Sequence, residues 1–210
     1  MHPAILLLPL VLAGDLEIAQ IVKPKARASK RICLVVDVSG SMAADLSALI
    51  STVQMIAQQP VDGWELSVIA FDGNAYRWHP YPKAKTKKAR ASVWAKLPDN
   101  RAIVRAVRWL KVKAASMGGT RILPALRMAL AQPVPKLTIF VVTDGLWQET
   151  GKMTLKRLAG LQRARVKAGF GEALVGTLVI RTVATEYNPA VLLANAGGGG
   201  CYQVRERKPK

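Results

Sequence analysis

The chain has 210 residues, of which 50% are hydrophobic, and it carries a formal net charge of +18. The length suits one domain with a substantial core, and the hydrophobic content excludes an intrinsically disordered protein. The charge far exceeds what solubility requires. It favours an anionic partner, such as nucleic acid, an acidic protein face or a membrane surface, or else it belongs to a solvated surface in a protein that is simply basic.

The amino-terminal stretch is the least decisive part of the sequence. The apolar run at residues 4–13 is too short to span a bilayer, and the sequence shows no transmembrane segment. Small residues at its end would suit signal-peptide cleavage, but no Lys or Arg precedes it and Pro9 interrupts it. The alternative is an extra strand or short helix packed on the sheet or on a neighbouring subunit. Residues 18–30 are expected to form an exposed basic lead-in.

Residues 32–42 (ICLVVDVSGSM) combine a buried strand with a polar turn. The first five are apolar and rich in β-branched side chains, which predicts a strand buried on both faces. Asp37, Ser39 and Ser41 then place one carboxylate and two hydroxyls at alternate positions, and Gly40 permits a tight turn. Taken alone, the pattern also fits a turn in which Asp37 or Ser39 caps the next helix.

The following segments alternate between helical and extended patterns. Apolar residues at helical spacing predict a helix over residues 43–59. Residues 64–71 are predicted to form a strand, residues 72–74 a tight turn, and residues 75–79 the antiparallel partner.

Residues 83–113 form the most basic region of the chain, and Pro98 divides it into two predicted helices. In the second helix we expect a buried stripe and a basic outer face, formed respectively by Ile103, Val104, Val107 and Leu110 and by Arg101, Arg105 and Arg108. Three tryptophans lie in or near this region, at Trp78, Trp94 and Trp109. They are able to stack on nucleic-acid bases, although packing is the commoner role of tryptophan.

The carboxyl-terminal half continues the alternation. The remaining predicted elements are a helix at 122–131, a strand at 137–143, a helix at 152–168 with Leu155, Leu158, Leu161 and Val166 inside, a strand at 173–181, a helix from the cap Asn188 to 195, and a strand at 201–205. Together these elements predict a doubly wound α/β sheet of six mostly parallel strands. The hairpin strand forms one antiparallel edge, and helices cover both faces.

Three predicted loops bring oxygen-bearing side chains to the same edge of this sheet. Asp37, Ser39 and Ser41 follow the first strand. Thr120 ends the glycine-rich turn at residues 117–120, and Asp144 follows the strand at 137–143. Carboxylate and hydroxyl oxygens suit a hard cation such as Mg²⁺ or Mn²⁺ better than Zn²⁺ or Cu²⁺.

This pattern resembles the metal-ion-dependent adhesion site (MIDAS) of the von Willebrand factor A (VWA) domain family. The family pattern is D-x-S-x-S in the first loop, a threonine in the second and an aspartate in the third, and all five positions are filled here. The resemblance covers residues 30–207. It leaves residues 1–29 as the apolar segment and basic lead-in, and residues 208–210 as a basic tail.

The resemblance implies a role for each residue. Ser39 and Ser41 would contact Mg²⁺ or Mn²⁺ directly, Thr120 directly or through water, and Asp37 and Asp144 mainly through water. The sixth metal position would be left for an Asp or Glu carboxylate of a partner protein. The implied function is a metal-dependent protein–protein interaction module within a larger assembly.

Other chemistries fit the sequence poorly, so we expect no enzyme activity. Neither His2 nor His79 is placed to activate Ser39 or Ser41, and no glycine-rich phosphate-binding motif is present. The two cysteines sit on strands that the family's strand order separates, so free buried thiols are expected at Cys33 and Cys201.

Two alternatives to the interaction module remain open. Residues 83–113 are basic enough to bind nucleic acid, which would give a steep salt dependence. A cleaved amino-terminal run would instead indicate a secreted adhesin. The cellular location therefore stays open between the cytoplasm, a large assembly such as a virion, and the periplasm or exterior.

Overall fold

The computed structural model describes residues 16–22, 29–57, 63–83, 85–87, 92–97, 99–114, 118–180 and 188–206. The apolar run at residues 4–13 and the tail at 208–210 lie outside this part of the chain. Within it, no helix has both the length and the apolar character needed to cross a bilayer.

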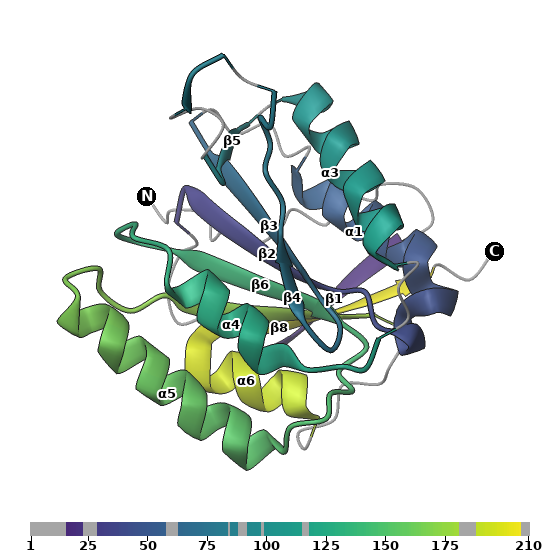
Figure 1. Ribbon diagram of the computed structural model, residues 1–210. Coiled ribbons are helices and arrows are strands. Elements are labelled where there is room, and N and C mark those ends of the chain that lie inside the picture. Colours follow the sequence, from purple (N-terminus) through teal and green to yellow (C-terminus); the bar gives the residue numbers. More distant parts are fainter. Residues whose placement is uncertain are drawn as a thin grey trace, which may run out of the picture.

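An eight-stranded sheet forms the centre of the molecule, in the order β1-β8-β7-β6-β2-β3-β4, with β5 also paired to β3 (Figure 1). The strands are β1 (Leu16–Val22), β2 (Arg31–Asp37), β3 (Glu65–Phe71), β4 (Ala75–Arg77), β5 (Ala95–Lys96), β6 (Thr138–Thr143), β7 (Leu174–Ile180) and β8 (Gly198–Glu206). The pairs from β8 through β7, β6 and β2 to β3 are parallel. The edge strands β1 and β4 run antiparallel to their neighbours.

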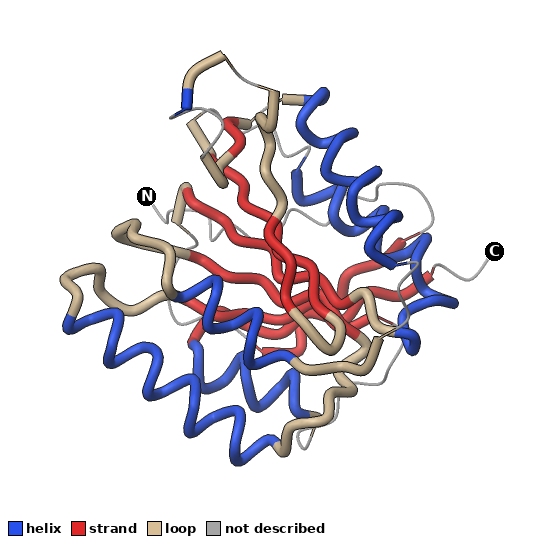
Figure 2. The backbone as a smooth tube through the Cα atoms, in the orientation of Figure 1, coloured by secondary structure: helices blue, strands red, loops and turns tan. Residues whose placement is uncertain are grey.

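Helices cover both faces of the sheet (Figures 1 and 2). One face carries α1 (Leu46–Ala57), which follows the 3-10 helix Gly40–Asp45, and α3 (Asn100–Ala114). The other carries α4 (Ile122–Leu130), α5 (Gly151–Lys167) and α6 (Pro189–Gly197). Successive residues of β2 point to opposite faces, so Leu34 packs in the core under α1 and α3, and Val35 in the core under α4 and α5.

This architecture confirms the predicted doubly wound α/β fold, and all six predicted strands are present. The structure adds β5 and β1. Where a basic lead-in was expected from residue 18, Leu16–Val22 instead pairs with β8 as an edge strand, and residues 23–28 lie outside the described residues. The alternation of Leu16 and Ile18 with Asp15 and Glu17 is the signal for this strand. Its pairing with β8 shifts register between Gln20 and Val22.

The predicted helices form, with corrections to their buried sides. In α3, Val104 is 55% exposed, whereas Ala102, Ile103 and Ala106 are buried. The predicted helix before Pro98 is contradicted at its end, where Ala95–Lys96 form strand β5, and residues 88–91 lie outside the described residues. The expected packing role of the tryptophan at position 78 is confirmed, because Trp78 is only 3% exposed in the core.

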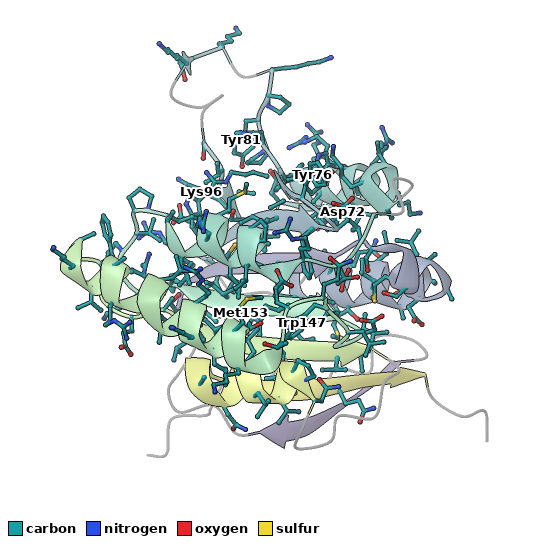
Figure 3. All side chains as sticks on the ribbon, turned by 60° about the horizontal axis from the view of Figure 1, so that its bottom comes forward. Asp72, Tyr76, Tyr81, Lys96, Trp147 and Met153 are labelled. Carbon is teal, nitrogen blue, oxygen red and sulfur yellow. The ribbon has the colours of Figure 1, made fainter. Side chains whose placement is uncertain are left out.

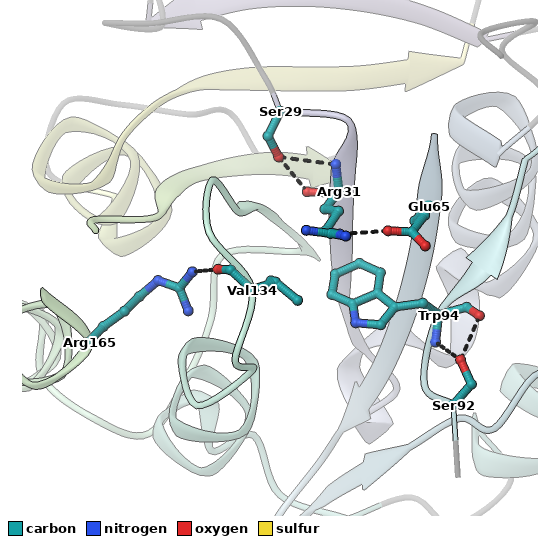
Figure 4. Close-up of polar contacts among 7 residues, drawn as sticks. All are labelled: Ser29, Arg31, Glu65, Ser92, Trp94, Val134 and Arg165. Atoms are coloured by element: carbon teal, nitrogen blue, oxygen red, sulfur yellow. Dashed lines mark hydrogen bonds and ion pairs between the residues drawn. The ribbon is translucent and has the colours of Figure 1, made fainter. Parts of the chain in front are cut away.

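Helix α5 departs further from a simple apolar stripe. Val166 is 49% exposed, while the neighbouring Arg165 is 3% exposed. The guanidinium of Arg165 donates hydrogen bonds to the carbonyl oxygens of Leu130, Gln132 and Val134, the last of which appears in Figure 4. A buried cation therefore holds the turn that follows α4 against α5.

Polar contacts also fix the amino ends of two central strands. Arg31 Nε lies 2.5 Å from Glu65 Oε2, joining the first residues of β2 and β3 (Figure 4). Cys33 and Cys201 are buried free thiols on β2 and β8, as expected, and β6 and β7 separate these two strands.

Candidate functional site

The carboxyl ends of β2, β3 and β6 lie side by side because these neighbouring strands are parallel. Asp37 is the last residue of β2, Asp72 follows β3, and Asp144 follows β6. The chain leaves β2 towards α1 on one face and returns to β6 from α4 on the other face. Such a switch point, at the carboxyl ends of parallel strands, is where open α/β sheets bind ligands.

Asp37 is fully buried at the centre of this edge. Its Oδ1 accepts a hydrogen bond of 3.0 Å from the backbone N–H of Ser39, and its Oδ2 accepts one of 2.8 Å from the hydroxyl of Thr143. The carboxylate is thus oriented from its own loop and from the end of β6. An oxygen with two lone pairs is able to accept a further hydrogen bond from a bound water.

The hydroxyls of Ser39 and Ser41 form the nearest pair of oxygens in the first loop. Ser39 is 2% exposed, whereas Ser41 is exposed to solvent. Their hydroxyls share a hydrogen bond, with the Oγ atoms 3.0 Å apart. The pair therefore presents two neutral oxygens at the boundary between the buried carboxylate and water.

The second loop reaches both of the other loops through its backbone. The N–H of Gly40 donates to the carbonyl oxygen of Gly118 at 3.3 Å, and the N–H of Gln148 donates to the carbonyl oxygen of Thr120 at 2.8 Å. Thr120 itself is half-buried. These contacts bring the loop of Thr120 between the loops that follow β2 and β6.

Gly118 is required for this approach. A Cβ built on Gly118 would lie 2.8 Å from Asp72 Cγ and Asp72 Oδ2, so no side chain fits there without moving that carboxylate. The N–H of Arg121 also donates to the Asp72 carbonyl oxygen at 2.8 Å. The second loop therefore also lies directly against the end of β3.

Asp144 brings a second carboxylate to the same edge. It is 6% exposed, and its Oδ1 accepts a hydrogen bond of 2.9 Å from the N–H of Leu146. Its charge contributes to the raised pKa of Asp37.

The pKa of Asp37 is raised from 3.8 to about 6. The largest cause is desolvation, since burial disfavours the charged form, and the charge of Asp144 raises it further. Hydrogen bonds from Ser39 and Thr143 oppose the shift without cancelling it. A cation in this edge would favour the ionised form of the carboxyl group.

The chemistry of this site fits a hard divalent cation. In an octahedral Mg²⁺ site with oxygens at about 2.1 Å, adjacent ligand oxygens lie about 3.0 Å apart. The Ser39–Ser41 oxygen pair has this separation. Among the described residues no group of three or more His, Cys, Asp and Glu side chains is arranged to hold a metal, so a cation here would depend on the hydroxyls.

Two residues at this edge were not predicted from the sequence. Thr143 orients Asp37 from β6, and Asp72 packs against the second loop from β3. Both had the same signal as Asp37, namely a polar residue at the end of an apolar strand. Neither belongs to the family pattern, which is why that pattern did not reveal them.

No family model and no curated protein sequence matches this chain. Solved structures do match. BatB, a conserved hypothetical protein from Bacteroides thetaiotaomicron, is 16% identical over 85% of this chain and 91% of its own, with a TM-score of 0.56. A von Willebrand factor type A structure from Catenulispora acidiphila is 17% identical, covering 87% of this chain and 43% of its own, with a TM-score of 0.52.

The human COPII-coat protein Sec24c is similar over 90% of this chain and 32% of its own, at 10% identity and a TM-score of 0.55. At such identities the likeness establishes the fold alone. The chain has a von Willebrand factor A fold, which agrees with the resemblance found in the sequence.

Proposed function

We propose that this protein is a metal-dependent protein-interaction module that binds a partner carboxylate through a divalent cation at Asp37, Ser39, Ser41, Thr120 and Asp144. The observation that carries the proposal is the pair of serine oxygens, 3.0 Å apart, beside the two buried carboxylates. The von Willebrand factor A fold, which provides such an edge between three loops, supports it.

The donor set favours binding of a charged ligand. Hydroxyl oxygens are neutral, so a cation held by them keeps much of its positive charge and attracts an anionic oxygen. Ser39 and Ser41 would hold Mg²⁺ or Mn²⁺ directly. Asp37 and Asp144 would orient its waters, and Thr120 would join from the second loop.

The proposed role is adhesion without catalysis. A carboxylate of an Asp or Glu in a partner protein would complete the coordination shell, and Ser41, which is exposed, lies on the side from which the partner approaches. The surplus of positive charge on the chain would draw such a carboxylate towards the site.

Calorimetric titration with Mg²⁺ and Mn²⁺ tests the metal site. We expect binding to the wild type and loss of binding in Asp37→Ala and Asp144→Ala, with circular dichroism showing a retained fold. Glu172→Ala removes an exposed carboxylate away from the loops and serves as the control. Unchanged metal affinity in both aspartate variants would refute the proposal.

The partner is tested separately, by capture from native lysate with and without EDTA. A partner that depends on the site is retained in Mg²⁺ and released by the chelator, and Asp37→Ala fails to capture it. Capture that is indifferent to EDTA would place the interaction on the basic surface instead.

A further inference from the structure

A groove of ≈ 930 Å³ runs along the outer surface between α4 and α5. It is lined on α5 from Lys152 to Arg163, a length of about 17 Å along the helix axis. The volume lies at the upper end of the range for small-molecule pockets, and the groove is as long as three helical turns. These dimensions suit a peptide segment.

The floor of the groove is apolar. Its apolar side chains are partly or largely exposed, and they come from both helices: Leu123, Pro124, Met153 and Leu161. Met153 is 42% exposed and is labelled near the amino end of α5 in Figure 3. Exposed apolar residues gathered in one groove are typical of an interaction site.

The rim of the groove is strongly basic. Six exposed cationic side chains line it: Arg121, Arg127, Lys152, Lys156, Arg157 and Arg163. None of them forms an ion pair with another described residue. Glu149 is the acidic residue in the groove lining, and it is only 6% exposed. Its carboxylate accepts hydrogen bonds of 3.2 Å from the N–H groups of Ile122 and Leu123. Its charge is directed at the amino end of α4, so no other described carboxylate of the lining compensates the rim.

Both walls of the groove are fixed. Glu149, just before α5, binds the amino end of α4, and Arg165, near the end of α5, binds the carbonyl oxygens of Leu130 and Gln132 at the carboxyl end of α4. The two helices therefore run in the same direction and are joined at both ends. A groove that is formed before binding costs less ordering free energy when its ligand arrives.

We propose that this groove is a second, metal-independent docking site for an acidic amphipathic helix of a partner protein. Apolar side chains on one face of that helix would contact the floor, and Asp or Glu residues on its flanks would meet the six cations of the rim. The proposal goes beyond the metal site, because its contacts lie on α4 and α5 and on Arg121, Glu149 and Thr150 just before them, and include none of the five proposed metal-site residues.

A peptide fits the groove better than a nucleic acid does. Among the described residues, the lining holds no aromatic side chain on which a base would stack. An apolar floor also offers nothing to a phosphate backbone, whereas it removes the apolar face of an amphipathic helix from water.

Gly160 provides a steric test. It lines the groove from α5, and a Cβ built on it would meet nothing within 4 Å. Gly160→Leu therefore fills the groove and also replaces a poor helix former. Ala159→Leu adds a leucine at the adjacent exposed position, which does not line the groove, and is the matched control.

Charge is tested by a matched pair of double variants. Lys156→Glu with Arg157→Glu reverses two charges of the rim. Arg108→Glu with Lys111→Glu makes the same change in net charge on exposed positions of α3, which covers the opposite face of the sheet. A difference between the two double variants separates the local rim from the overall charge.

The probe is a fluorescent helical peptide of about 14 residues, or about 21 Å, with leucines on one face and glutamates on its flanks. Anisotropy should show binding to the wild type in Mg²⁺ and equally in EDTA. We expect the affinity to fall by about tenfold or more in Gly160→Leu and in the rim double variant, and by less than about twofold in both controls. Asp37→Ala should bind the peptide normally, so the failure of the metal site and that of the groove are distinguishable.

Three results would overturn the proposal. The first is no binding of the peptide to the wild type, or binding unchanged in Gly160→Leu. The second is equal weakening in the two double-charge variants, which would indicate a general electrostatic attraction. The third is displacement of the peptide by a single-stranded oligonucleotide that binds the wild type more tightly than the peptide does. In this outcome Gly160→Leu would lose the binding of the oligonucleotide.

Discussion

The hydroxyl of Thr143 donates a hydrogen bond of 2.8 Å to Oδ2 of Asp37, so the last residue of β6 orients the last residue of β2. The same Thr143 oxygen accepts a hydrogen bond of 3.0 Å from the N–H of Gly145. One buried side chain thus connects the first loop of the candidate metal site to the third. The orientation of the site depends on a residue outside the five proposed ligands.

Thr143→Val should weaken metal binding without removing any proposed ligand. The loss of this hydrogen bond raises the pKa of Asp37 above about 6 and frees its carboxylate to rotate. We expect the affinity for Mn²⁺, measured by calorimetry at pH 7, to fall by about tenfold, as is common when a partner of a ligating or orienting group is removed. Thr143→Ser keeps the hydroxyl and should stay close to the wild type. Equal affinities in the valine and serine variants would show that this contact has no role.

The metal-free protein should lose stability as the pH rises through the range between 4 and 6. The pKa of Asp37 is about 6 in the folded state against 3.8 ordinarily, so in this range the native state holds a proton that the unfolded chain has released. Above pH 6, ionisation of Asp37 in the folded state lowers the free energy of unfolding by about 3 kcal/mol. Below pH 4 this loss is absent.

Urea denaturation in EDTA measures this dependence. Asp37→Asn removes the titrating group, so its free energy of unfolding should decline less between pH 4 and pH 7 than that of the wild type. Added Mg²⁺ should reduce the decline in the wild type alone, because the cation favours the ionised carboxylate. Parallel pH profiles for the wild type and the asparagine variant would contradict the assignment.

Arg165→Leu should destabilise the fold by about 3 kcal/mol, since three carbonyl oxygens lose their charged donor in a buried place. These oxygens belong to Leu130, Gln132 and Val134 in the turn after α4. Arg163→Leu, an exposed position two residues earlier, is the control and should change the free energy of unfolding by less than about 0.5 kcal/mol. The measurement is the urea midpoint of each variant.

Gly199→Ala should be destabilising by about 1–3 kcal/mol, whereas Gly160→Ala should be stabilising by about 0.5–1 kcal/mol. A Cβ on Gly199 would lie 2.4 Å from the backbone nitrogen of Gly176 on the neighbouring strand, whereas a Cβ on Gly160 would meet open space. Thermal unfolding of the two variants should therefore shift in opposite directions. A shift in the same direction would show that the close approach of β7 and β8 relaxes easily.

The fold was predictable because its central strands carry their own signals. Residues 32–36 and 139–142 are continuous apolar runs, and such runs form strands that are covered on both faces. The edge strand β1 escaped prediction because its alternation is short, ending where Ala19 follows Ile18. A pattern of this length does not separate an edge strand from a loop.

The candidate site was predictable as a set of loops but not as a set of contacts. The order of the strands places Asp37 and Asp144 at one edge, which the sequence pattern implied. The hydrogen bond from Thr143 and the packing of Asp72 against Gly118 join residues far apart in the chain, and periodicity carries no information about such pairs. The burial of Arg165 in place of Val166 was equally unpredictable, because the carbonyl oxygens to which Arg165 donates lie in another segment of the chain.

Strand β1 pairs with β8, so that Leu16 lies opposite Glu206 with almost the entire described chain between them. During synthesis, β1 therefore stays unpaired until β8 has left the ribosome. Contacts between residues so distant in sequence slow folding, and an unpaired strand edge is exposed to aggregation in the meantime. Chains stopped before residue 198 should accordingly depend on chaperones far more than chains that include β8 do.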